Sequence, residues 1–212
     1  MRTFEQFLSE NVAHGGVNIV FEAGMFALIN KLEIIAKALR EAGVEFEVVG
    51  GMAVNAHIAR SHRSETFLTR DVDLLADRND LSRITEAVKS IGYEAKKIMG
   101  GYALMRPGEG LGEGIHLLFV GEKSKSTQPL PHPPLRPETK ELFGITIPVA
   151  PLQDLIQMKL NSFRPKDVVH LEILDDVGLI SSEIEASLPA LLLDRLRDAR
   201  RQHAEGKPDV EG

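Results

Sequence analysis

The sequence predicts an α+β fold, in which a sheet domain is followed by a helical part. Apolar residues recur at helical spacing over 26–41, alternate with polar ones over 44–48, and return to helical spacing from residue 151 onward. Strands followed by a run of helices are typical of α+β proteins. We expect an N-terminal helical extension over 1–25, a sheet domain over 26–150, C-terminal helices over 151–203 and a flexible tail over 204–212.

The first half of the sheet domain is marked by alternating helix and strand patterns. A helix over 26–41 has an apolar face and ends before Gly43, where glycine enters the left-handed conformation at little cost. The face consists of Leu28, Leu32, Ile35 and Leu39. A half-buried strand follows over 44–48, Gly50 and Gly51 end it, and 52–59 continues as a helix.

The second half contains most of the predicted strands. After a polar link over 60–70, a short strand spans 71–75, and a helix over 81–91 is capped by Asn79 or Asp80. Strands are expected over 93–106, 115–120 and 145–149. The segment 121–140 contains five prolines and is expected to be a long irregular loop.

The C-terminal part has signals for helix starts. Pro151 and Pro165 suit the first turn of a helix, where the missing N–H is not needed. Ser182 and Glu185 have the spacing of a capping box for the last helix.

Composition excludes several classes of protein. The 212 residues are 43% hydrophobic and 26% charged, which is typical of a globular chain that buries a core. Cysteine is absent, which excludes disulfides, thiolate metal sites and a cysteine nucleophile. The formal net charge of -6 leaves no global basic field for nucleic acid. No apolar run approaches the roughly 20 residues of a membrane span, so we expect a cytoplasmic protein without a membrane partner.

Two short motifs carry the chemistry. Asp71 and Asp73 are two positions apart, so in a strand their carboxylates share one face, about 6.6 Å apart at roughly 3.3 Å per residue. Such a pair repels itself unless a cation lies between, and Mg²⁺ prefers oxygen ligands. Gly50 and Gly51 allow close approach of a phosphate to the start of a helix. The sequence therefore predicts neighbouring metal and phosphate sites.

These motifs resemble the signature of the DNA polymerase beta-like nucleotidyltransferase superfamily, and most closely its small bacterial abortive-infection and toxin-type members. The likeness rests on Gly50-Gly51 and on Thr69-Arg70-Asp71-Val72-Asp73-Leu74. It extends to the helical part through Lys159, Arg164 and Lys166-Asp167. The resemblance implies a nucleotidyltransferase-like mixed β-sheet flanked by helices. It also implies transfer of a nucleoside monophosphate from a metal-bound triphosphate to an acceptor hydroxyl.

Site residues follow from the resemblance. Asp71 and Asp73 would bind Mg²⁺, with Mn²⁺ as the alternative, while Gly50 and Gly51 would hold the phosphates. Further nucleotide contacts are expected from Thr69, Arg70 and Lys159. The amine of Lys159 is expected to point into the nucleotide-binding cleft. Active members of the superfamily carry a third carboxylate on a neighbouring strand. This chain has His116 there, which as imidazole can accept a proton near neutral pH but lacks the negative charge.

Three functions remain open on the sequence alone. The first is a nucleotidyltransferase whose acceptor is a protein, an RNA or a small molecule. The second is a catalytically weakened nucleotide-binding or toxin–antitoxin-type interaction module with a partner protein. The third is a metal-dependent glycosyltransferase, since an Asp-x-Asp pair also binds sugar nucleotides. We rank it last because the chain is shorter than expected for a doubly wound donor domain.

Overall fold

A computed structural model describes residues 3–6, 19–59, 67, 69, 71–110 and 114–206. The chain divides into two compact units, Met1–Pro151 and Leu152–Gly212. Arg70 and the end of the expected flexible tail, beyond residue 206, lie outside the described residues. None of the described helices is both long and apolar enough to cross a bilayer.

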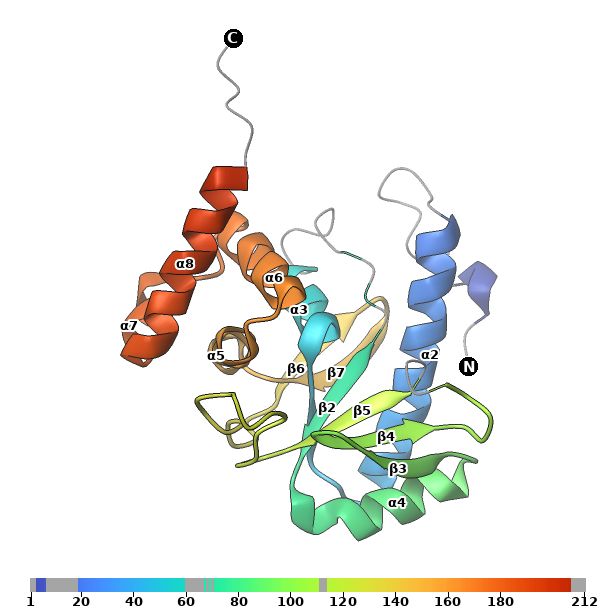
Figure 1. The fold of residues 1–212 in the computed structure, drawn as a ribbon. Coiled ribbons are helices and arrows are strands. Elements are labelled where there is room, and N and C mark those ends of the chain that lie inside the picture. The colour runs from blue at the N-terminus through green and yellow to red at the C-terminus, as the bar shows by residue number, and fades with distance from the viewer. Residues whose placement is uncertain are drawn as a thin grey trace. The chain divides into compact units, whose positions relative to one another are not determined.

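The first unit is built on a seven-stranded mixed sheet of order β3-β4-β5-β2-β1-β7-β6 (Figure 1). Its strands are β1 Phe46–Val49, β2 Val72–Ala76, β3 Glu94–Ile98, β4 Gly101–Met105, β5 Ile115–Phe119, β6 Glu138–Leu142 and β7 Ile145–Val149. β1 pairs antiparallel with β2 and parallel with β7, and β2 pairs parallel with β5. The predicted α+β class, with a mixed sheet flanked by helices, is confirmed.

Helices α2, α3 and α4 accompany this sheet. α2 spans Ile19–Glu41, α3 spans Gly50–Ile58 and α4 spans Leu81–Ser90, the last preceded by a 3₁₀ turn over Arg78–Asp80. The predicted apolar face of α2 supplies Leu32, Ile35 and Leu39 to the core, all with 0% exposure. α2 contacts α4 and β7, while α3 contacts β1, β2 and β6. α3 begins on the two glycines rather than after them, so the glycine turn forms part of the helix start.

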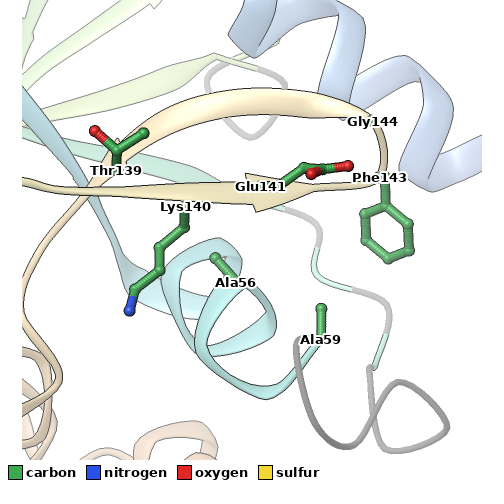
Figure 2. Close-up of a pocket in the computed structure, with 7 residues that line it drawn as sticks. All are labelled: Ala56, Ala59, Thr139, Lys140, Glu141, Phe143 and Gly144. Atoms are coloured by element: carbon green, nitrogen blue, oxygen red, sulfur yellow. The ribbon is translucent and has the colours of Figure 1, made fainter.

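The proline-rich segment is shorter than expected. The prediction of an irregular loop over 121–140 is wrong at its end, because β6 begins at Glu138 and forms a hairpin with β7. The turn, which carries Phe143 and Gly144 (Figure 2), has φ of 45° and 76° at these residues, which is the geometry of a tight hairpin. The charged residues of β6 hide the strand pattern, and its pairing with β7 decides its structure.

The second unit is helical. α5 spans Leu152–Ser162, α6 spans Pro165–Asp176, α7 spans Ser182–Ser187 and α8 spans Ala190–Gly206. α5, α6 and α8 contact one another around buried Leu160, Leu171 and Leu196. The predicted cap at Ser182 is wrong by one residue, because the Oγ of Ser181 accepts from the N–H of Ile184 at 3.4 Å. The C-terminal segment is also two helices, α7 and α8, rather than one.

Candidate functional site

Three adjacent strands in the middle of the sheet carry the candidate site. Asp73 on β2 is in register with Val49 on β1 and with His116 on β5. Residues in register on neighbouring strands point to the same face of a sheet. Asp73 and His116 therefore share one face of the sheet. Val49, the register partner of Asp73, directly precedes Gly50.

The two side chains are hydrogen-bonded. Nδ1 of His116 lies 3.2 Å from Oδ1 of Asp73, and the two side chains are 28% and 19% exposed. A carboxylate can only accept, so in this pair the imidazole donates from Nδ1. When the ring is neutral, this tautomer makes Nε2 the hydrogen-bond acceptor. Asp73 thus selects the tautomer of His116 and orients its ring.

Gly50 lies against the same carboxylate. Its φ is 72°, a conformation that residues with a side chain rarely adopt. A Cβ added to Gly50 would collide with Oδ2 of Asp73 and would lie 3.0 Å from Cγ. Both the positive φ and the lack of space for a Cβ require glycine here. Because glycine has no side chain, Asp73 can approach the turn.

The start of α3 is suited to an anion. Val49 occupies the N-cap and has no side-chain oxygen to accept from the first turn, and no acidic residue lies in that turn. The first N–H groups of a helix have no partner within the helix and lie at the positive end of its dipole. Gly50 and Gly51 place no side chain of their own in front of these N–H groups.

Asp71 and Thr69 lie just before β2. Asp71 is half-buried and falls one residue before the strand, so strict strand alternation does not govern it. The Oγ1 of Thr69 donates to the carbonyl of Asp71 at 3.1 Å, which closes a local turn. The structure thus brings Gly50, Asp73 and His116 together and places Asp71 two residues from Asp73, while Arg70 is outside the described residues.

Lys159 belongs to α5 in the second unit and is 4% exposed. Its Nζ donates to Oδ1 of Asp167 at 3.1 Å, and Nε of Arg164 donates to Oδ2 at 2.7 Å. Burial by itself would raise the pKa of Asp167. The hydrogen bond from Arg164 and the charge of Lys159 outweigh it and lower that pKa to about 2. The resemblance implied a nucleotide contact for Lys159, and the structure shows this buried ion pair.

Asn55 is a positioning residue that the sequence analysis missed. This side chain on α3 is fully buried, and it donates to the carbonyl of Phe67 at 2.8 Å and accepts from its N–H at 3.1 Å. The pair of bonds holds the chain two residues before Thr69. An amide within an otherwise apolar helix face was the available signal, since buried polar groups are normally paired.

The carboxylates of the site fit a magnesium ion that arrives together with a triphosphate. Among the residues that the structure describes, no group of three or more histidine, cysteine or carboxylate side chains is arranged to hold a metal ion. Mg²⁺ is commonly bound by one or two carboxylates, with phosphates and waters completing its shell. Asp71 and Asp73 fit an ion that arrives with a triphosphate better than a resident ion in a protein cage.

Comparison with solved structures supports the fold. No family model matches the chain, and no curated protein matches it. The crystal structure of the aminoglycoside nucleotidyltransferase ANT(2'')-Ia in complex with adenylyl-2''-tobramycin has a TM-score of 0.52 at 14% identity, covering 83% of this chain and 97% of that one. A solution structure of the same antibiotic-resistance factor has a TM-score of 0.48 at 15% identity, covering 85% and 86%. At this identity the crystal structure shows a shared fold.

Proposed function

We propose that this chain is a nucleotidyltransferase that binds a nucleoside triphosphate with Mg²⁺ and transfers a nucleoside monophosphate to an acceptor hydroxyl. The observation that carries the proposal is the position of the Asp73 carboxylate, against Gly50 on one side and bonded to His116 on the other. The shared fold adds support, because the crystal structure of ANT(2'')-Ia contains an adenylyl group attached to tobramycin.

Each residue has a distinct role in the proposal. Gly50, Gly51 and the first N–H groups of α3 bind the phosphates. Asp71 and Asp73 hold Mg²⁺ or Mn²⁺, which when bound neutralises charge on the phosphates. Thr69 and Arg70 contact the nucleotide from the segment before β2.

His116 acts as the general base. Its Nε2 accepts the proton of the acceptor hydroxyl, while Nδ1 stays bonded to Asp73. A bond forms between the acceptor oxygen and the α-phosphorus, the bond from that phosphorus to the bridging oxygen breaks, and pyrophosphate leaves. Imidazole thereby supplies the basic function that a third carboxylate has in the superfamily.

The proposed acceptors are a small polyhydroxylated molecule, a protein or an RNA. The adenylyl-tobramycin in the neighbour favours testing aminoglycosides first. A second candidate function is a nucleotide-binding module that acts through a partner protein. The histidine in place of a carboxylate favours testing this module as well.

The test is transfer of label from each of four α-³²P-labelled triphosphates, with Mg²⁺ or Mn²⁺, to aminoglycosides and to cell lysate. Asp73→Asn should abolish transfer, whereas Asp194→Asn on the surface of α8 should not change it. Label on an acceptor that depends on Asp73 supports the enzyme. Tight triphosphate binding without transfer supports the module, and neither binding nor transfer contradicts both.

A further inference from the structure

A second pair of reactive side chains lies in the loop that follows β5. The Oγ of Ser124 is 2.9 Å from Nε2 of His132, and Nδ1 of His132 is 2.9 Å from the carbonyl oxygen of Phe119. His132 is 5% exposed, whereas Ser124 is half-buried and so reaches solvent. Neither residue belongs to the site described above.

The proton positions follow from the partners. A carbonyl oxygen can only accept, so Nδ1 of His132 carries a proton and donates it to Phe119. Burial is the main cause that lowers the pKa of His132, so the ring is neutral at neutral pH and its Nε2 has a free lone pair. Ser124 therefore donates its hydroxyl proton to Nε2. A hydroxyl bonded to a base that a third group orients is the arrangement of an activated nucleophile.

Several backbone contacts fix this pair in place. The N–H of His132 donates to the carbonyl of Glu122 at 2.8 Å, and the N–H of Gly121 donates to that of His132 at 3.1 Å. A Cβ added to Gly100, in the β3–β4 turn, would lie 2.5 Å from the carbonyl oxygen of Ser124. Gly100 thus packs directly on the backbone of Ser124. The loop is therefore fixed both by its backbone hydrogen bonds and by this contact.

The surroundings favour an anionic reactant. Lys123 and Lys125 flank Ser124 and are exposed. The nearest acid in sequence, Glu122, forms a double hydrogen bond with Arg78. Two exposed cations beside a hydroxyl attract a polyphosphate and offset the charge that builds up when the hydroxyl attacks it.

We propose that Ser124 is an acceptor hydroxyl, nucleotidylated by the site of a second copy of this chain, an inference that rests on the proposed function. The Ser124 oxygen bonds to the α-phosphorus of the triphosphate held by that copy, the bond to the bridging oxygen breaks, and pyrophosphate leaves. The hydroxyl proton passes to Nε2 of His132. The product is a phosphodiester on Ser124.

Transfer occurs between copies because the two sites lie at opposite ends of the same strand. His116 is the second residue of β5, and the Ser124 loop follows its last residue, Phe119. At roughly 3.3 Å per residue, β5 alone separates them by about 10 Å. Because the triphosphate site and Ser124 lie at opposite ends of β5, we place the donor triphosphate in a second copy.

The experiment mixes two variants of the full chain with Mg²⁺ and α-labelled triphosphate and locates the label by peptide mass spectrometry. Asp73→Asn serves as the acceptor copy, Ser124→Ala as the donor copy, and a mass tag distinguishes them. Label is expected on Ser124 of the Asp73→Asn copy only in the mixture. Ser126→Ala, which removes an exposed hydroxyl two residues away, should not reduce labelling of wild type. His132→Gln should slow it by roughly a hundredfold, the lower range for loss of a general base.

The outcomes separate the two proposals. If donor copies label a lysate or aminoglycoside acceptor but leave Ser124 unlabelled, the assignment of Ser124 is overturned and the proposed function stands. If Asp73→Asn alone becomes labelled, or if no acceptor is labelled by any copy, the proposed function fails and the assignment fails with it. Melting temperatures of His132→Gln and wild type show whether a loss of label reflects unfolding, and Ser124→Thr, which keeps a hydroxyl, should retain label.

Discussion

Asp73 and His116 are register partners on parallel strands, and Nδ1 of the imidazole lies 3.2 Å from Oδ1 of the carboxylate. The other oxygen of that carboxylate faces Gly50. One aspartate thereby contacts both the glycine turn, which is suited to phosphate, and a histidine whose imidazole is suited to accept a proton.

His116→Asn should separate the orienting bond from the basic function. Its Nδ2 can still donate to Asp73, but asparagine has no nitrogen that accepts a proton, so transfer should fall by roughly a hundredfold to ten-thousandfold. Triphosphate binding should change little. A full transfer rate in this variant would exclude His116 as the base. A gain of about a hundredfold in His116→Asp would instead show that the histidine had weakened a carboxylate-dependent enzyme.

Gly50→Ala should destabilise the protein more than Gly43→Ala. Both glycines have positive φ, of 72° and 66°, so each alanine incurs a backbone cost of about 1–2 kcal/mol. A Cβ at Gly43 meets nothing within 4 Å, whereas one at Gly50 collides with Asp73. Urea unfolding of the two variants measures the difference. Equal losses would mean that Asp73 moves away from Gly50 without cost.

Mg²⁺ with a triphosphate should raise the melting temperature of wild type. A ligand at 100 times its Kd stabilises the native state by about 2.7 kcal/mol through mass action. The double variant Asp71→Asn and Asp73→Asn should lose this gain, while its melting temperature without ligand is unchanged or higher because two like charges are removed. Differential scanning calorimetry provides the measurement, and an undiminished response of the double variant would place the metal elsewhere.

Acid should weaken the second unit through Asp167. Its folded pKa of about 2 lies below its ordinary value of 3.8, so its contribution to stability is present above pH 4 and is lost as the pH falls toward 2. The shift corresponds to about 2 kcal/mol. Asp167→Asn should be destabilised at pH 7, because Lys159 then loses its buried partner. The difference in unfolding free energy between wild type and variant should shrink between pH 4 and pH 2. A constant difference would contradict this role for the pair.

Local pattern was sufficient for the elements that bury one face. The spacing of Leu32, Ile35 and Leu39 predicted α2, because burial on one side imposes the period of the element on the sequence. The alternation over 44–48 predicted β1 correctly as a strand, but the expected half-burial is wrong, because neighbouring strands and helices bury every residue of β1, Glu47 included. Residue type alone identified the glycine pair at the end of β1 and the carboxylate of Asp73. Glycine and aspartate destabilise a strand unless a turn or a polar partner requires them.

Only the tertiary structure decided which of these residues meet. β2 and β5 are parallel and separated by two intervening strands in the sequence, so the pairing of Asp73 with His116 depends on a long-range register that no local pattern encodes. The bond between Ser124 and His132 likewise exists because the proline-rich loop closes on itself. The sequence by itself determined the chemistry that was available. The sheet order and loop closure determined which groups are near enough to react, because register depends on packing that is not local in sequence.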